Sequence, residues 1–141
     1  IIILFGIDRI SKIKVISGFN EHSYFINNFL NIDLIWNIGV GFGLFSTDNS
    51  LIYNFLSFFI FIVITSLFYI FIKSSNLDKL IYAIIIGGAL GNFYDRLVFK
   101  GVPDFIDLHY NNFHWFTFNA ADIFITIGVI IFIIRSFFLK N

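Results

Sequence analysis

An all-α integral membrane protein, with four transmembrane helices and a small β-rich element outside the membrane, is the fold class that the sequence predicts. Composition is the first reason: of 141 residues, 58% are hydrophobic and 13% are charged, whereas ordinary soluble domains are about 25% charged. The second is that residues 51–72 carry no charge, and about 20 such residues cross a bilayer as a helix. The third is that acidic and amide side chains gather in residues 87–122, between apolar segments. The length predicts one domain, 1–141.

The first part of the chain is predicted to give an incomplete helix and the β-rich element. Residues 1–7 are mostly apolar but too few to cross a bilayer, so residues 1–16 are interpreted as the end of a first transmembrane helix whose start is missing. Residues 17–50 are assigned to the β-rich element, because apolar and polar side chains alternate through 30–38 as in a strand. The glycines that follow favour a bend, and TDNS at 47–50 has turn and helix-cap chemistry.

The rest of the chain is predicted to give three helices joined by a turn and a loop. Asp78 is placed to start the helix that follows the turn. Pro103 and several aromatic side chains suit a loop at the membrane interface. The predicted segments are helix 51–72, turn 73–79, helix 80–97, loop 98–118 and helix 119–139.

Missing residue types narrow the chemistry. There is no cysteine, which excludes disulfides and thiol nucleophiles. The three histidines, His22, His109 and His114, lack HExxH or similar spacing, so neither a metal nor another cofactor is expected. Nine basic and nine acidic residues give a net charge of zero, and nucleic acid is therefore not expected as a partner.

Two helical faces carry polar residues. On the third helix, four residues at i, i+3, i+4 and i+7 share one face. These are Gly88, Gly91, Asn92 and Asp95. On the fourth helix, Asn119, Asp122 and Thr126 also share a face. Gly87 and Gly91 have the spacing that lets another helix approach closely, so we expect the two polar faces to meet near one membrane surface.

A pair of carboxylates is the chemistry that this arrangement predicts. Two carboxyl groups a few ångströms apart share a proton and titrate together. One can activate water while the other protonates a leaving amine, which is the chemistry of aspartic proteases. Asp104 and Asp107, in the predicted loop, can reach the same place as Asp95 and Asp122. Spacing alone does not choose the pair.

Several of the acidic residues also have plainer interpretations. Asp95 beside Arg96 is typical of a helix cap or a charge partner. Asp8, followed by Arg9 and Lys12, is typical of a charge cluster beside a membrane. Each of these arrangements needs no catalytic role.

The remaining acids divide by their surroundings. Asp33 and Asp107 are interpreted as solvated, whereas Asp104 and Asp122 lie in apolar sequence without an adjacent cation. Carboxylates in a membrane also serve proton-coupled transporters and channel subunits. That alternative predicts a polar path to the opposite membrane surface, and residues 51–72 are almost free of polar groups.

Five short blocks resemble, in order along the chain, those of the bacterial lipoprotein signal peptidase family, signal peptidase II. They are FGIDRISK (5–12), WNIGVGF (36–42), GGALGNFYDR (87–96), GVPDFID (101–107) and FNAAD (118–122). Val40 and Gly41 stand where the family usually has two alanines, and Arg9 stands where it often has a neutral polar residue. Neither departure removes a catalytic group.

The resemblance implies an intramembrane aspartyl endopeptidase that removes signal peptides from diacylglyceryl-modified prolipoproteins, cutting before the lipidated cysteine. It implies that Asp104 and Asp122 are catalytic. It implies supporting or substrate-binding roles for Asn37, Asn92, Asp95, Arg96, Asn119, Asp8 and Lys12. It also places the β-rich element and the catalytic end on the extracytoplasmic side of a bacterial inner membrane. The partners that it implies are the prolipoprotein and membrane lipid, and the expected state is a monomer.

Overall fold

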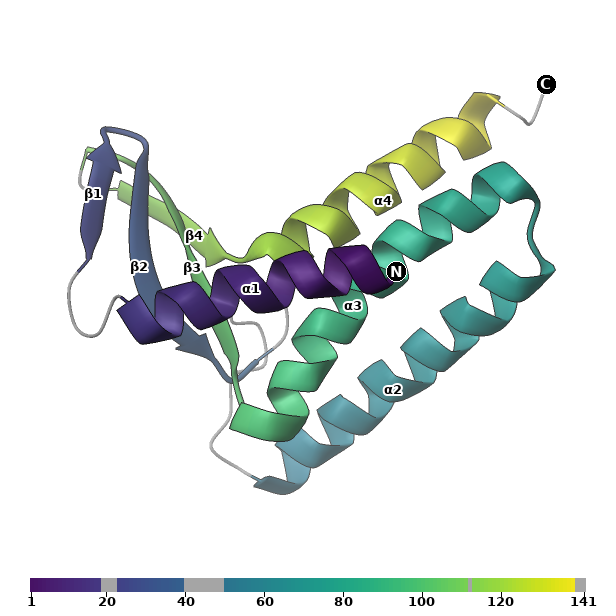
Figure 1. Cartoon of the computed structure of the whole chain (residues 1–141), viewed down its shortest axis with the longest axis horizontal. Coiled ribbons are helices and arrows are strands. Elements are labelled where there is room, and N and C mark those ends of the chain that lie inside the picture. Colours follow the sequence, from purple (N-terminus) through teal and green to yellow (C-terminus); the bar gives the residue numbers. More distant parts are fainter. Residues whose placement is uncertain (19–22, 40–49, 112, 139–141) are drawn as a thin grey trace.

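The structure, a computed structural model, describes residues 1–18, 23–39, 50–111 and 113–138. In these residues the chain forms four helices and four strands (Figure 1). In order they are α1 (Ile2–Gly18), β1 (Tyr24–Asn27), β2 (Leu30–Asn37), α2 (Ser50–Lys73), α3 (Asn76–Phe99), β3 (Val102–Tyr110), β4 (Phe113–Phe118) and α4 (Ala120–Phe138).

Helix α3 is the centre of the helical part. It contacts α1, α2 and α4, while the strands gather at one end of the molecule (Figure 1). The turn between α2 and α3 and the C-terminal end of α4 lie at the opposite end. The third helix begins at Asn76, four residues before the predicted start, because Ser75 takes the N-cap position and Asp78 lies in the first turn.

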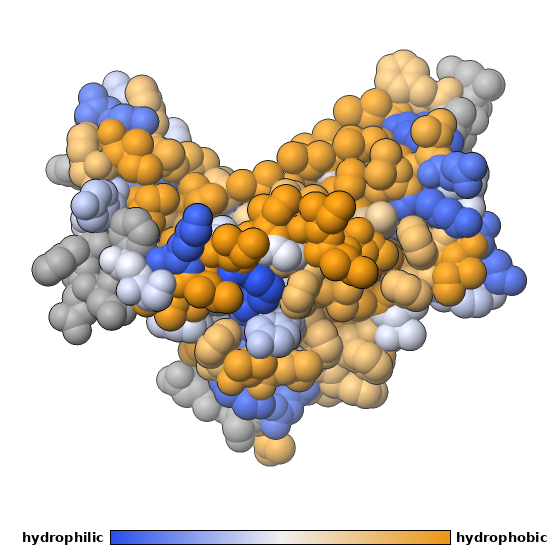
Figure 2. Space-filling view, in the orientation of Figure 1, coloured by the Kyte–Doolittle hydropathy of each residue, from blue (hydrophilic) through white to orange (hydrophobic). Residues whose placement is uncertain are grey.

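Two helices have the length and apolar composition of membrane spans, Leu51–Lys73 and Ala120–Phe138. Large apolar side chains remain exposed along both, such as Phe55 and Ile130, and the space-filling view shows an apolar surface over much of the helical part (Figure 2). A helix that is apolar on all sides suits lipid surroundings. Among the described residues α1 and α3 do not meet the same criteria. Two helices therefore have the length and composition of a span, and the four spans stay a prediction.

The prediction that residues 98–118 form a loop was wrong. Val102–Tyr110 and Phe113–Phe118 pair as an antiparallel hairpin, and with β1 and β2 they complete a four-stranded sheet in the order β1-β2-β3-β4. The β-rich element expected within 17–50 supplies two of these strands. Strand β3 was not predicted from the sequence because it contains Pro103 and two aspartates, and strands usually avoid these residue types. The predicted glycine bend falls largely outside the described residues, and so do residues 47–49 of the predicted turn.

An extra residue in β2 decides which way its polar side chains face. Ile32 pairs with Ile106, but Ile35 pairs with Asp104, so two residues of β2 lie opposite one of β3. Such a bulge reverses the alternation of side chains between the faces of the sheet. As a result Asn31 and Asn37, six residues apart, lie on opposite faces of the sheet.

Candidate active site

Glycines let three helices approach closely enough to bring the polar residues together. A Cβ atom added to Gly88 would lie 2.5 Å from the carbonyl oxygen of Ala121 in α4. One added to Gly91 would overlap the carboxylate of Asp8 in α1, and one added to Gly87 would lie 3.0 Å from the Cβ of Leu4. The predicted close approach at Gly87 and Gly91 is therefore confirmed, with α1 as the partner helix.

Asp104 is a buried carboxylate of β3 that receives hydrogen bonds from two amides. Asn37 Nδ2 donates to its Oδ2 at 2.9 Å, and Asn119 Nδ2 donates to its Oδ1 at 2.6 Å. The side chain is almost fully buried. Burial raises the pKa of Asp104 to about 6, the nearby charge of Asp122 adds to the increase, and the two amide hydrogen bonds oppose it. This carboxyl group is therefore protonated more readily than an ordinary aspartate.

Asp122 is fixed by the start of α4. Asn119 precedes the helix and accepts a hydrogen bond from the Asp122 N–H at 3.2 Å, while the Asn119 N–H donates to Asp122 Oδ2 at 3.1 Å. This reciprocal pair is the arrangement of a capping box. Asn92 Nδ2 of α3 donates to the other carboxylate oxygen, Oδ1, at 2.8 Å. Asn119 thus contacts both Asp104 and Asp122, which join into one polar cluster.

A second cluster beside it is built from opposite charges. Lys12 Nζ lies 2.9 Å from Asp8 and 2.7 Å from Asp95 Oδ2, and Arg9 lies 2.6 Å from Asp95 Oδ1. Asp8, Lys12 and Asp95 are each 0% exposed. The prediction that Asp8 forms a charge cluster with Arg9 and Lys12 is confirmed. The cluster is buried inside the protein, however, whereas a charge cluster beside a membrane was expected. Asp95 has charge partners as expected, but they are Arg9 and Lys12 rather than Arg96.

Lys12 connects the two clusters. Its Nζ donates to Asn92 Oδ1 at 2.8 Å, and the Nδ2 of the same amide donates to Asp122. Asp8 also accepts a hydrogen bond from the Ala121 N–H at 3.1 Å, one residue before Asp122. The charges on α1 therefore hold the first turn of α4 in place.

Arg96 binds backbone carbonyls. Its Nη1 donates to the Asn92 carbonyl at 3.0 Å, and its Nη2 donates to the Gly39 carbonyl at 2.8 Å. The guanidinium is buried. By holding Gly39 against α3, Arg96 fixes the end of β2, which carries Asn37.

The interpretation of Asp107 as solvated was wrong, because it is 3% exposed. It lies beside His109 of the same strand and His114 of β4. Sequence reasoning missed these histidines as potential ligands because it searched for short helical spacings. The sequence signal for this cluster was the spacing of Asp107 and His109, which are two residues apart as on one face of a strand, with His114 following after a turn. Asp33 is partly exposed.

Known proteins are similar to this chain in sequence and in fold. The model of the family described as signal peptidase (SPase) II matches residues 1–138. The chain belongs to the signal peptidase II family. A lipoprotein signal peptidase of Pelagibacter ubique (strain HTCC1062) is 46% identical over all of this chain and 87% of its own length. The lipoprotein signal peptidase of Anaplasma marginale (strain Florida) is 39% identical over 94% of this chain and 79% of its own length.

Solved structures agree with the membership in signal peptidase II. A bacterial membrane enzyme determined by the in meso method at 2.3 Å resolution superposes with a TM-score of 0.85 at 30% identity, covering 99% of this chain and 86% of that one. A second, at 1.9 Å resolution, gives a TM-score of 0.78 at 31% identity over 96% of this chain and 88% of that one. As a member of the signal peptidase II family, the chain is a membrane protein and a hydrolase of the protease class.

Proposed function

We propose that this protein is an intramembrane aspartyl endopeptidase that removes signal peptides from diacylglyceryl-modified prolipoproteins, cutting before the lipidated cysteine. The relatives are lipoprotein signal peptidases, which supports the substrate class. The observation that carries the proposal is that Asp104 and Asp122 both contact Asn119 and, among the described residues, neither makes an ion pair. Asp104 is buried and Asp122 is partly buried, and burial of a carboxylate without a paired cation favours its protonated form.

In the proposed reaction the two carboxyl groups share one proton. The ionised member takes a proton from water while the oxygen of that water bonds to the scissile carbonyl carbon, and the protonated member donates its proton to the carbonyl oxygen. Collapse of the tetrahedral intermediate breaks the C–N bond. The proton first taken from water passes to the leaving amine, and the other carboxylate takes a proton from a hydroxyl of the intermediate, which restores the one shared proton. Asp104 and Asp122 exchange acid and base roles in the course of one turnover.

The supporting residues act by position in this proposal. Asn37, Asn92 and Asn119 direct amide N–H groups at the two carboxylates, so they set the orientation of both. Lys12, with Asp8 and Asp95, fixes Asn92 and the start of α4. Arg96 fixes the end of β2, where the substrate backbone would lie alongside Asn37.

The proposed setting is a bacterial inner membrane, with the sheet and both catalytic residues at the extracytoplasmic face and the chain acting as a monomer. Lipid contacts the exposed apolar surfaces of α2 and α4. The acyl chains of the substrate would enter from the same lipid phase, so the cleavage site can reach the two aspartates without leaving the membrane surface.

A proton-coupled transporter or channel subunit is not favoured. Ser57, Thr65 and Ser66 of α2 each donate to a carbonyl of their own helix four residues earlier. Such hydroxyl groups are satisfied within the helix and do not line a polar path along it. The relatives are peptidases.

The test is cleavage of a diacylglyceryl-modified precursor in detergent by Asp104→Asn and Asp122→Asn. Each variant should lose activity by at least about 100-fold, since positioned general acids and bases contribute roughly 100- to 10,000-fold. Asp78→Asn is the matched control, because Asp78 lies in the first turn of α3 and contacts Ser75 and Arg135. Full activity in either test variant would remove that residue from the mechanism.

A further inference from the structure

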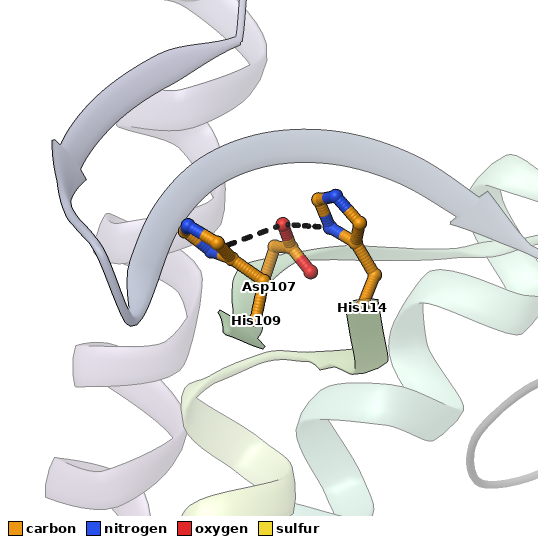
Figure 3. A group of neighbouring side chains, drawn as sticks. All are labelled: Asp107, His109 and His114. Carbon is orange, nitrogen blue, oxygen red and sulfur yellow. Dashed lines mark hydrogen bonds and ion pairs between the residues drawn. The ribbon is translucent and has the colours of Figure 1, made fainter. Parts of the chain in front are cut away.

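Three side chains with metal-ligand chemistry meet on the β3–β4 hairpin (Figure 3). They are Asp107 and His109 of β3 and His114 of β4. The Nδ1 atom of His114 lies 2.7 Å from Asp107 Oδ2, and the Nδ1 atom of His109 lies 3.8 Å from the same oxygen. One potential ligand atom from each residue lies within 4.8 Å of the other two. Figure 3 shows both imidazole rings turned toward the carboxylate.

The cluster lies on the face of the sheet opposite the catalytic pair. Side chains alternate between faces along a strand, so Asp107 and Asp104, three residues apart on β3, point to opposite sides. Their partners agree with this: Asn37 contacts Asp104, whereas Asn31 contacts Asp107. The two sites are therefore separate.

A second bulge, in β4, brings His114 to the cluster. Leu108 pairs with Phe116, but His109 pairs with His114, so Trp115 is the extra residue. In a regular ladder Trp115 would lie opposite His109. The bulge puts the two histidines directly across from each other, with ring centroids 5.3 Å apart, and such bulges commonly redirect a side chain at a functional site.

The buried histidine has a nitrogen without a partner. His109 is 5% exposed, and its Nδ1 atom makes no hydrogen bond within the described residues. The 3.8 Å to Asp107 is too long for one. The Oδ1 atom of Asn31, whose Nδ2 contacts Asp107, is also buried and has no hydrogen-bond partner in the part of the chain that the structure describes. Buried polar atoms are almost always satisfied, so these atoms indicate that a further group binds among them.

We propose that Asp107, His109 and His114 bind a divalent transition-metal ion of the zinc type. Zinc takes imidazole nitrogen and carboxylate oxygen at about 2.0–2.2 Å and commonly has three protein ligands and one open position. Ligand atoms around a tetrahedral zinc are then about 3.3 Å apart. This distance lies between the 2.7 Å and 3.8 Å that separate Asp107 Oδ2 from the Nδ1 atoms of His114 and His109. Two nitrogen ligands of three disfavour calcium and magnesium, which prefer oxygen.

The entry side of the proposed site is His114, whose side chain is 57% exposed, whereas Asp107 is 5% exposed. A metal bound there joins β3 to β4 at the turn end of the hairpin. The other end of the same hairpin carries Asp104 on β3 and leads from Phe118 directly into Asn119. The ion would therefore stiffen the support of the catalytic pair without contacting it.

The experiment uses the full chain, purified with a tag that lacks histidine and placed in detergent micelles. Calorimetric titration with ZnCl₂ should give one zinc ion per chain, and Co²⁺ should give the visible absorption bands of a tetrahedral site. His114→Ala, at an exposed position, and Asp107→Asn should each lower zinc affinity at least about tenfold, since even the residues that support metal ligands matter by 10- to 100-fold. The matched control is Asp33→Asn on β2, which should bind zinc as the parent does.

Several outcomes would overturn the proposal. No zinc binding by the parent chain, or undiminished binding by His114→Ala, would show that the three residues form only a hydrogen-bonded cluster. The variant Asp104→Asn should still bind zinc with parental affinity, because it lies on the other face of the sheet. Loss of zinc binding in that variant would place the metal at the catalytic pair and refute the site proposed here, independently of whether the peptidase proposal holds.

Discussion

Two pairs of carboxylates lie side by side in this protein and are held by opposite means; Asp8, Asp95 and Asp104 are buried, and Asp122 is partly buried. The cation-paired carboxylates are Asp8 and Asp95, which contact Lys12 and Arg9. The amide-held carboxylates are Asp104 and Asp122, which receive hydrogen bonds from asparagines and a backbone N–H. In the first pair the two carboxylates are matched by two cations. The second pair makes no ion pair among the described residues, and burial raises the pKa of Asp104.

The two pairs of carboxylates connect different parts of the molecule. The cation-paired carboxylates join α1 to α3 and to the start of α4, whereas the amide-held carboxylates join α4 to the sheet. Asn92 is the residue between them, accepting from Lys12 and donating to Asp122. The orientation of the Asp122 carboxylate thus depends on the charged cluster through Asn92.

The largest expected effect comes from breaking the charge balance of the first pair. Lys12→Met leaves two buried carboxylates with one cation and should lower the free energy of unfolding by about 3–5 kcal/mol, the usual cost of removing one partner from a buried ion pair. Thermal unfolding in detergent measures it. Lys14→Met, on the exposed side of the same helix, is the control. Equal melting temperatures for the two variants would contradict a structural role for the cluster.

The two pairs should respond to neutralisation with opposite signs. Burial raises the pKa of Asp104 to about 6, against about 3.9 in an unfolded chain. The native state therefore binds more protons between these values, and the stability that protonation supplies is present below about pH 4 and lost as pH rises through 6. Asp104→Asn should then be more stable than the parent at pH 8, by up to about 3 kcal/mol, with little gain at pH 4.

Asp95→Asn is the counterpart and should be less stable than the parent at pH 8, because Arg9 and Lys12 lose a charged partner. Chemical unfolding at pH 4 and pH 8 provides both comparisons. A loss of stability in Asp104→Asn at pH 8 would mean that its carboxylate is structurally required, like those of the cation-paired group.

Helix approach offers a smaller and more local test. Gly91→Ala should disturb Asp8 and lower stability, and Gly88→Ala should displace Ala121 and the adjacent Asp122, each costing about 1–3 kcal/mol. Peptide cleavage should fall more in Gly88→Ala than in Gly91→Ala. Gly6→Ala, with open space around it, should be neutral or stabilising by about 0.5–1 kcal/mol. Equal activities in the first two variants would refute the division between the pairs.

The smallest effect concerns one hydrogen bond. The amide of Asn37 lowers the pKa of Asp104 against the effect of burial, so Asn37→Ala should raise that pKa further. The limb of the pH–activity profile that reports Asp104 should move to higher pH, with a loss in kcat/KM of about tenfold or less. Asn27→Ala, an exposed amide of β1, should leave the profile in place. A shift to lower pH would show that Asn37 does not donate to the ionised carboxylate.

Local periodicity predicted much of the helical site. The common face of Gly88, Gly91, Asn92 and Asp95 is buried as a unit, because helical spacing is a property of the sequence itself. Asp8 and Lys12 form the i,i+4 pair that their spacing favours. The pairing of Arg9 with Asp95 could not be predicted, since no local pattern relates residues in two helices.

The sheet was harder to predict, for a different reason. Strand β3 contains Pro103 and two aspartates, which argue against a strand when read alone. They are tolerated because Asn37, Asn31 and Asn119 satisfy the carboxylates from neighbouring segments. Choosing Asp104 and Asp122 from the resemblance stays a prediction, which the burial of Asp104 and the asparagine contacts of both residues support.

The extra residue in β2 has a consequence for comparing and recombining related sequences. Asn31 and Asn37 serve opposite faces of the sheet only because the count of residues between them includes the bulge. Deleting Asp33 or Leu34 would restore regular alternation and turn one of the two asparagines to the wrong side. In a chimaera the length of this short segment would matter more than the identity of any side chain within it, so a gap in an alignment here would signal a changed active site.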